Sequence, residues 1–215
     1  MPSQQRRNRQ ETEQALVRAV GDALLQDGFA RFGVNAIARQ ADVDKALIYR
    51  YFGGLDELLQ RFTEQTEIWW QVDDMAAIAL SGPGSDSLAD SLAQMFNAHM
   101  DYLIHHLVTL EIIAWEMADR NALTIALEYQ REQRSLALMK TLLAHHGATS
   151  RDDLVRIGPV MAMLNAAGNY LAARSRHVQN FNGLDLRTDR GWQQLHNAVR
   201  GMLRSLTETY PIVDP

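Results

Sequence analysis

The sequence predicts an all-α protein of about nine helices, with a small N-terminal part and a larger helical body. Two observations support this prediction. Apolar residues recur every three or four positions along almost the whole chain, which is the helical period, and no alternating strand pattern persists. In addition, residues 36–52 contain two short helical segments joined by a tight turn, which is the arrangement of a helix-turn-helix.

The composition is that of a globular protein. The chain has 215 residues, 47% of them hydrophobic, so it can bury a sizeable core. It has no cysteine, which excludes disulfides and thiolate metal sites. No apolar run reaches the length of a membrane span, and the basic N-terminus lacks the apolar segment of a signal peptide. We therefore expect a soluble cytoplasmic protein with no membrane partner.

The formal net charge of −5 is unevenly distributed. Residues 1–62 contain nine Lys or Arg and eight Asp or Glu, whereas residues 63–215 contain twelve and eighteen. The acidity therefore lies in the body, and the N-terminal part keeps a slight positive balance. Arg6, Arg7 and Arg9 precede the first expected helix, and they form either a solvated tail or a basic arm that contacts phosphate.

The N-terminal part is expected to begin with two helices. The first carries Leu16 and Leu24 on its apolar face, and it ends at Gly28. The second covers residues 34–41 and buries one face. Asp42 then forms the turn, because Asp is one of the few residues besides glycine that tolerates a left-handed backbone.

Two further helices are expected before the body. Asp44 is a suitable N-cap for the third helix, since its carboxylate can accept a hydrogen bond from a backbone N–H of the first turn. Gly53 ends that helix. A long fourth helix begins at Leu55 and is expected to continue through Trp69 and Trp70.

The body is expected to be helical as well. Residues 81–85 form the clearest break in the chain, Gly147 ends a long helix, and Gly158-Pro159 marks a kink or a restart. A loop is expected over residues 177–188. The remaining helices are expected over approximately residues 86–106, 107–119, 122–146, 150–174 and 189–209.

The helix-turn-helix pattern predicts DNA binding, with the third helix in the major groove. Lys45 and Ala46 lie in its first turn, where base edges are contacted, although a solvated lysine is an equal alternative for Lys45. Tyr49 lies off the inward face and suits a phosphate or a thymine methyl group, and Tyr51 suits a phosphate. The predicted DNA-binding residues are Arg6, Arg7, Gly33, Val34, Asn35, Arg39, Lys45, Ala46, Tyr49 and Tyr51.

A specific combined pattern is formed by Gly28-Phe29, Ile37-Ala38, Ala41, Val43, Ile48-Tyr49-Arg50-Tyr51-Phe52 and Leu58-Leu59. Through this pattern, approximately the first 60 residues, about a quarter of the chain, resemble the TetR family of one-component transcriptional regulators. Three positions depart from the family pattern: Asp42 replaces a glycine, Gly33 a serine or threonine, and Leu55 a lysine. The last two departures remove phosphate contacts, so we expect weaker non-specific DNA binding unless the arginine arm compensates.

This resemblance implies a domain organisation and a function. Residues 1–60 would form a three-helix helix-turn-helix DNA-binding domain with a basic arm, and residues 61–215 a helical ligand-binding and dimerisation domain. The protein would be a ligand-responsive repressor, released from a palindromic operator in double-stranded DNA by a small apolar or aromatic effector. Two alternatives are a transcriptional activator on the same fold and a helical adaptor that has lost DNA binding.

The resemblance also implies an effector pocket in the body and a four-helix dimer interface. Aromatic and methionine stripes alone more often form plain core, and the last two helices can also pack inside one subunit. The predicted ligand-binding residues are Trp69, Phe96, His99, Met100, Leu103, Trp115, Glu116, Tyr129, Asn165 and Asn169. The predicted homodimer interface consists of Met161, Leu164, Gly168, Leu171, Leu195, Val199, Met202 and Leu206.

An enzyme is the main rival class, and the sequence does not favour it. The adjacent pairs His105-His106 and His145-His146 point about 100° apart on a helix, so neither pair readily chelates one metal ion. The sequence contains no zinc-protease motif, no nucleophile elbow and no phosphate-binding glycine loop. We therefore predict no catalytic residues, no metal and no cofactor.

Overall fold

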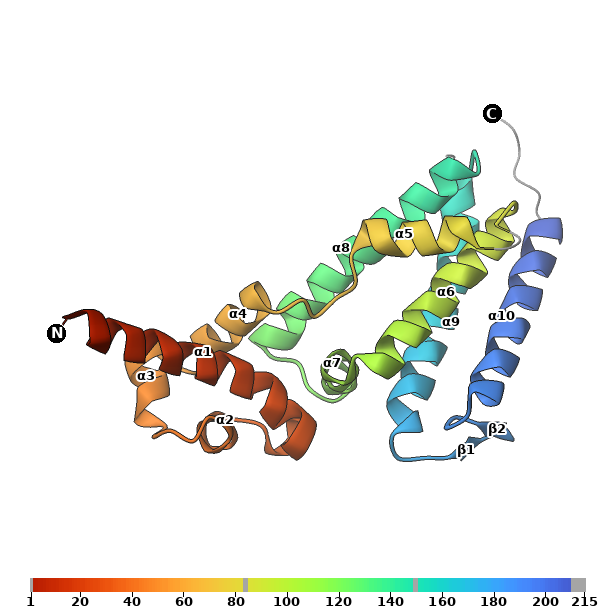
Figure 1. Ribbon diagram of the computed structural model, residues 1–215. Coiled ribbons are helices and arrows are strands. Elements are labelled where there is room, and N and C mark those ends of the chain that lie inside the picture. Colours follow the sequence, from red (N-terminus) through yellow and green to blue (C-terminus); the bar gives the residue numbers. More distant parts are fainter. Residues whose placement is uncertain (1, 83–84, 149–150, 210–215) are drawn as a thin grey trace. The chain divides into compact units, whose positions relative to one another are not determined.

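The computed structural model describes residues 2–82, 85–148 and 151–209. Within these residues it contains ten α-helices, one short 3-10 helix and one two-stranded sheet, which confirms the all-α prediction (Figure 1). The chain divides into two compact units, residues 1–69 with 107–129 and residues 70–106 with 130–215. Helix α8 (Ala122–His145) contributes its first residues to the first unit and the rest to the second.

The first unit is built around three N-terminal helices. Its elements are α1 (Pro2–Asp27), η1 (Phe29–Arg31), α2 (Val34–Gln40), α3 (Ala46–Phe52), α4 (Leu55–Gln65) and α7 (Leu107–Ala118). The side chains of Leu16, Leu24, Ile37, Ile48 and Leu58 are fully buried, so the apolar faces of α1 to α4 meet in one core. Burying such side chains stabilises the unit by about 1.5–3 kcal/mol each.

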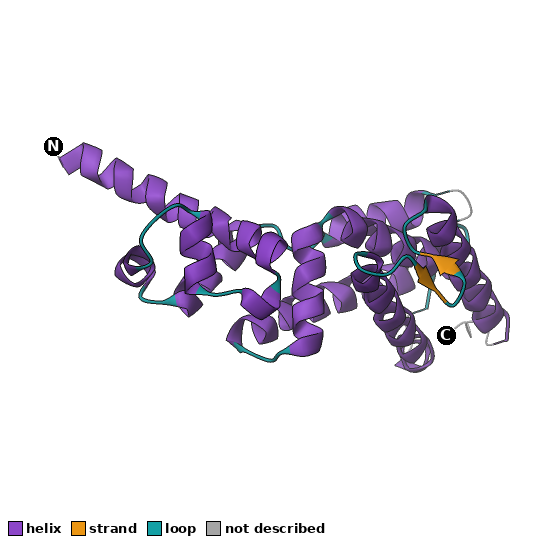
Figure 2. Cartoon of the chain, turned by 90° about the horizontal axis from the view of Figure 1, so that it is seen from below, coloured by secondary structure: helices purple, strands orange, loops and turns teal. Residues whose placement is uncertain are grey.

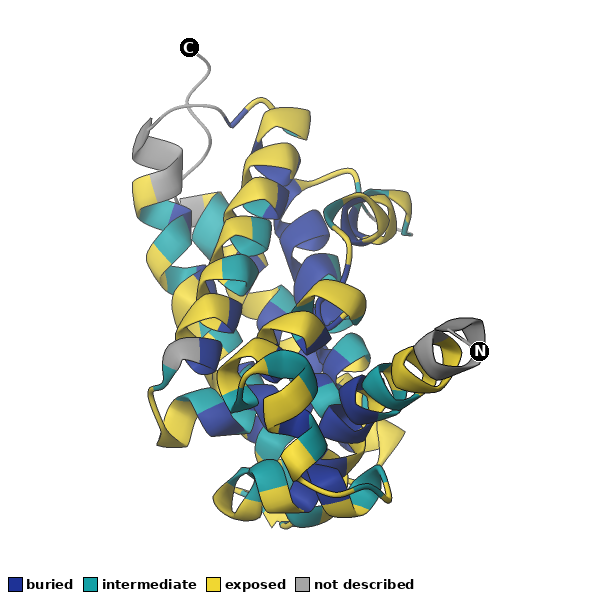
Figure 3. Cartoon of the chain, turned by 90° about the vertical axis from the view of Figure 1, so that its left-hand side faces the viewer, coloured by how far each residue is buried: buried dark blue, intermediate teal, exposed yellow. Residues whose placement is uncertain are grey.

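The second unit is a helical body organised around α6. Its elements are α5 (Val72–Ser81), α6 (Leu88–His105), α9 (Arg151–Ser175), β1 (Asn180–Phe181), β2 (Leu184–Asp185), α10 (Asp189–Thr209) and the rest of α8. Helix α6 packs against α5, α9 and α10, and its apolar side lies in the interior (Figures 1 and 3). The buried carboxylate of Asp90 on α6 also pairs with Arg204 of α10 at 2.9 Å.

The α6–α9 contact depends on a glycine. A Cβ at Gly168 of α9 would lie 2.6 Å from the Met100 sulfur and 2.9 Å from the Phe96 ring, both on α6. Both α6 side chains are buried, so neither can move away freely. Gly168 therefore permits the two helices to approach closely within one chain.

The predicted long helix from Leu55 through Trp70 is wrong. Helix α4 ends at Gln65, and α5 begins only at Val72. Ile68, Trp69 and Trp70 are all buried, and three consecutive residues cannot share one face of a helix. The segment is fixed by the Thr109 hydroxyl, which donates a hydrogen bond to the Ile68 carbonyl at 2.5 Å.

Three smaller features also differ from the sequence predictions. The predicted loop over residues 177–188 contains the hairpin β1–β2, which turns at Asn182 and Gly183 with positive φ at both (Figure 2). Helix α9 continues through Pro159 without a restart. Ser150, the expected start of that helix, lies outside the described residues. None of the described helices combines the length and the apolarity needed to cross a membrane.

Candidate nucleic-acid interface and ligand cavity

The turn between α2 and α3 is set by local backbone chemistry. Asp42 adopts φ of 53°, the left-handed conformation that the sequence predicted there. The Val43 N–H donates to the Ala38 carbonyl at 3.1 Å, which closes the end of α2. The Asp44 carboxylate accepts a hydrogen bond from the Ala46 N–H at 2.8 Å and caps the first turn of α3. These contacts fix α3 relative to α2 in the form of a helix-turn-helix.

Helix α3 presents a polar face to solvent. Ile48 is fully buried, whereas Tyr49 is 56% exposed, and Lys45 and Ala46 at the start of the helix are exposed. Among the described residues, the Lys45 ammonium group forms no ion pair. The exposed face thus carries an available cation and a phenol, which are suitable groups for a base edge and a phosphate.

Tyr51 lies between two cations. The Arg9 guanidinium is 5.1 Å from the centre of the Tyr51 ring, and the Arg50 guanidinium is 5.9 Å from it. Both distances are within the range of cation–π contacts. The Arg9 contact connects the N-terminal end of α1 to the end of α3, and the sequence analysis did not anticipate it.

The predicted arginine arm ahead of the first helix is wrong. Helix α1 begins at Pro2, so Arg7 and Arg9 are helical residues. Because residues four apart share a helix face, Arg7 pairs with Glu11 at 3.0 Å and Arg9 with Glu13 at 2.7 Å. Arg6 belongs to the same helix, and its side chain lies outside the described residues.

The residues predicted on α2 occupy different environments. Asn35 is exposed, whereas Gly33 and Val34 are half-buried at the start of the helix. The exposed Arg39 side chain is held by an ion pair with Asp27 at the end of α1. Asn35 differs from the other three residues. Its polar side chain is exposed, and it forms no ion pair within the described residues.

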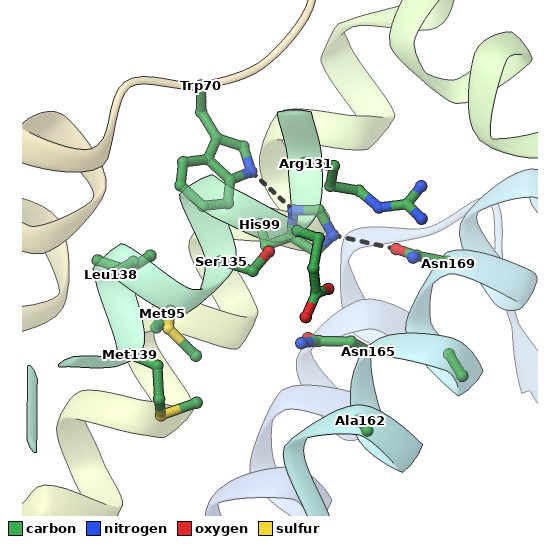
Figure 4. Close-up of a pocket in the computed structure, with 12 residues that line it drawn as sticks. Trp70, Met95, His99, Arg131, Ser135, Leu138, Met139, Ala162, Asn165 and Asn169 are labelled. Carbon is green, nitrogen blue, oxygen red and sulfur yellow. Dashed lines mark hydrogen bonds between the residues drawn. The ribbon is translucent and has the colours of Figure 1, made fainter. Parts of the chain in front are cut away.

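The second unit contains a cavity of about 280 Å³ between α6, α8 and α9 (Figure 4). Its apolar lining includes Trp70, Met95, Leu138 and Met139, and small residues of α9 complete it. Its polar lining consists of His99, Arg131, Glu132, Ser135, Asn165 and Asn169. A concave apolar surface with a few convergent polar groups is the usual form of a small-molecule site.

A hydrogen-bonded chain of three side chains crosses one wall of this cavity. The Trp70 indole N–H donates to His99 Nδ1 at 3.1 Å, and His99 Nε2 lies 3.0 Å from Asn169 Oδ1 (Figure 4). An indole N–H can only donate, so Nδ1 must accept and the proton of the neutral ring must be on Nε2. His99 therefore donates to Asn169, and the orientation of the Asn169 amide follows.

Burial of His99 lowers its pKa from 6.5 to about 4. The hydrogen bond to Asn169 opposes this shift, and the nearby Arg131 cation adds to it. The geometry agrees with the direction, since a protonated Nδ1 would point its hydrogen at the indole N–H. His99 is thus a neutral donor and acceptor at physiological pH.

The predicted ligand-binding residues separate into three groups. His99, Asn165 and Asn169 line the cavity. Phe96, Met100 and Leu103 are buried residues of α6 that do not line it. The other four belong to the first unit and are Trp69, Trp115, Glu116 and Tyr129. Within that unit, Trp115 packs edge-on against Phe32.

The sequence analysis missed Trp70 and the α8 side of the cavity. Arg131, Ser135 and Leu138 are four and three residues apart, so they follow one face of α8 toward the cavity. The i, i+4 and i+7 spacing of these residues is a sequence signal that could have found this face. Trp70 was placed on a continuous helix and could not be separated from Trp69.

The predicted dimer-interface residues also separate by burial. Met161, Gly168, Leu171 and Val199 are buried inside the chain itself, so they offer no surface to a partner. Leu164, Leu195 and Leu206 are half-buried, and Met202 is 51% exposed. The exposed apolar surface of α9 also includes Met163, which is 65% exposed.

The fold and the exposed face of α3 define a helix-turn-helix protein with a helical body. Residues 22–62 match the family model described as bacterial regulatory proteins, tetR family. Comparison of the chain with curated proteins finds no match.

The same fold occurs in several solved structures. One is a TetR-like transcriptional regulator from Rhodococcus sp. RHA1, with 21% identity, a TM-score of 0.57 and coverage of 89% of this chain and 95% of that one. Another is NalD, the secondary repressor of the MexAB-OprM multidrug efflux pump in Pseudomonas aeruginosa, with 15% identity, a TM-score of 0.57 and the same coverage. The chain thus carries a TetR-type N-terminal segment and has the fold of TetR-family transcriptional regulators.

Proposed function

We propose that this protein is a ligand-responsive, DNA-binding transcriptional repressor that acts as a homodimer in the cytoplasm. The observation that carries the proposal is the exposed face of α3, where Lys45 has no ion pair among the described residues and Tyr49 is exposed beside it. The match of residues 22–62 to the tetR family model supports the same assignment. As part of this proposal, residues 1–60 bind DNA and residues 61–215 bind the effector and the partner subunit.

A dimer would give the protein its sequence specificity. One recognition helix contacts too few base pairs for a unique site, and a two-fold dimer doubles the footprint. Selection of duplexes from a random library at near-physiological salt tests this directly. We expect a palindrome whose half-sites are about 34–36 Å apart or a multiple of that distance. Weak, salt-sensitive binding without enrichment would contradict the proposal and favour the adaptor.

We propose that the partner subunit packs on the exposed apolar side of α9 and α10. Met163 on α9 and Met202 on α10 are 65% and 51% exposed. The double variant Met163→Glu with Met202→Glu should sediment as a monomer, because charges are depleted from the centre of such interfaces. Gln193→Glu adds a charge on the opposite side of α10 and should leave the dimer intact. A dimeric double variant would contradict this placement.

We propose that effector binding and DNA binding oppose each other. The cavity in the second unit offers a site of suitable size, and a ligand that prefers one conformation shifts the population toward it. The coupling in such systems is typically about 1–3 kcal/mol. DNA affinity measured with and without a cavity ligand tests it, and equal affinities would exclude the regulatory part of the proposal.

A further inference from the structure

Within the described residues, the Asn169 amide has one orientation, and its N–H donor group has no acceptor. Its Oδ1 accepts from His99 Nε2, and His99 is itself fixed by the donor-only indole of Trp70. If the amide reversed, two N–H donors would face each other, either at His99 Nε2 or, with the other histidine tautomer, at the Trp70 indole. No described residue accepts a hydrogen bond from Asn169 Nδ2, and Asn169 lines the cavity. The wall of the cavity thus presents an N–H donor of fixed direction.

The formal charges of the side chains that line the cavity sum to zero. Arg131 and Glu132 are adjacent on α8 and both line the cavity, while His99 is neutral. A ligand with a net charge would leave one charge without compensation in a partly desolvated site, which is unfavourable. The lining therefore favours an uncharged ligand.

The apolar wall favours an aromatic ligand of modest size. The Trp70 ring and the thioethers of Met95 and Met139 line the cavity, and methionine sulfurs contact aromatic rings favourably. The volume of about 280 Å³ lies just below the usual range for drug-sized ligands. A compound of about two fused rings matches it.

We propose that this cavity binds a small, uncharged aromatic compound whose carbonyl oxygen accepts a hydrogen bond from Asn169 Nδ2, next to the Trp70–His99 pair. This inference rests on the proposed function, since that compound would be the effector. The carbonyl satisfies the fixed amide donor, and the rings cover the apolar wall.

Three matched probes test the ligand class with the full chain and without DNA. They are 2-acetylnaphthalene, which carries the carbonyl, 2-ethylnaphthalene, which lacks it, and 2-naphthoate, which is anionic. Isothermal titration should show the ketone binding about tenfold or more tightly than the hydrocarbon, because the hydrocarbon leaves the amide donor unsatisfied. The anion should also bind more weakly than the ketone. Equal affinities, tighter binding of the anion, or no binding of any probe would overturn the proposal.

Substitutions on α9 test the role of the amide. Asn169→Asp keeps an oxygen for His99 Nε2 and removes the N–H donor, so the preference for the ketone over the hydrocarbon should be lost. Asn197→Asp places the same charge on an exposed residue of α10 that does not line the cavity, and it should keep the preference. Asn169→Ala removes the donor without adding a charge, and circular dichroism checks that each variant is folded. A preference that survives both Asn169 substitutions would overturn the proposal.

The outcome for the ligand class is separable from the outcome for the proposed function. Ketone preference without selection of any DNA duplex would retain the site and reject the regulator. Selection of a palindromic duplex without ketone preference would retain the regulator and reject the ligand class.

Discussion

Acid should destabilise this protein through His99. The pKa of His99 is lowered from 6.5 to about 4 because the ring is buried. An unfolded chain therefore binds a proton at this position near pH 6.5, whereas the folded chain binds it only near pH 4. The contribution of His99 to stability is complete above pH 6.5 and is lost as the pH falls from 6.5 to about 4.

The size of the effect follows from the pKa difference. Each pKa unit is worth about 1.36 kcal/mol, so the change from 6.5 to about 4 corresponds to about 3 kcal/mol. This is a large part of the stability of a typical domain. His99 is only 8% exposed, so screening by solvent does little to reduce this contribution to stability.

The assay compares urea unfolding of the wild type and His99→Gln between pH 7.5 and pH 4. Glutamine can accept from the Trp70 indole and donate to Asn169, but it does not titrate. Burial also lowers the pKa values of His146 and His196, and both proteins share those groups. The difference between the two proteins therefore isolates His99. The wild type should lose about 3 kcal/mol more than the variant, and parallel curves would refute the reasoning.

Three further substitutions test the packing and the DNA-binding face. Gly168→Ala should lose about 1–3 kcal/mol of unfolding free energy, because its Cβ would contact buried side chains of α6. As a control, Gly201→Ala should not be destabilised, because its Cβ would meet open space. A stable Gly168→Ala protein would show that α6 and α9 can separate. Asp44→Ala removes the side-chain cap of α3, so the free energy of unfolding in urea should fall by about 1 kcal/mol. An unchanged free energy of unfolding would mean that the cap is not needed. Lys45→Ala should reduce discrimination at one base pair per half-site by about 1–3 kcal/mol; uniform weakening across sequences would indicate a phosphate contact instead.

Features set by local backbone chemistry were predictable from the sequence. Gly28, Asp42, Gly53 and Gly147 all adopt positive φ at the helix ends and the turn where they were expected. Each of these positions depends on the residue itself and on its immediate neighbours, so no distant contact is needed to predict it.

Features set by distant contacts were not predictable in the same way. The break after Gln65 depends on the Thr109 hydroxyl, which is 41 positions from the Ile68 carbonyl in the sequence. The Trp70–His99–Asn169 chain likewise joins residues 29 and 70 positions apart. The sequence analysis named His99 and Asn169 as candidate ligand-binding residues, but it could not show that they meet each other.

The sequence could not show which side of a helix is buried where the helix has two apolar sides. Met161 and Met163 of α9 are two positions apart, and one is buried while the other is 65% exposed. Small and apolar residues lie on more than one side of the middle of α9, so composition did not reveal which side faces α6. Only the close approach at Gly168 decides this.

The ion pairs of the first unit have a consequence for how a regulator searches a genome. Arg7, Arg9 and Arg39 each lie beside an acidic side chain, so these three cations contribute less to the displacement of counterions from random DNA. Such a protein is held weakly by the millions of non-operator sites that compete for it. Under the proposed function, a larger fraction would stay free in the cell, and fewer copies would be needed to keep one operator occupied.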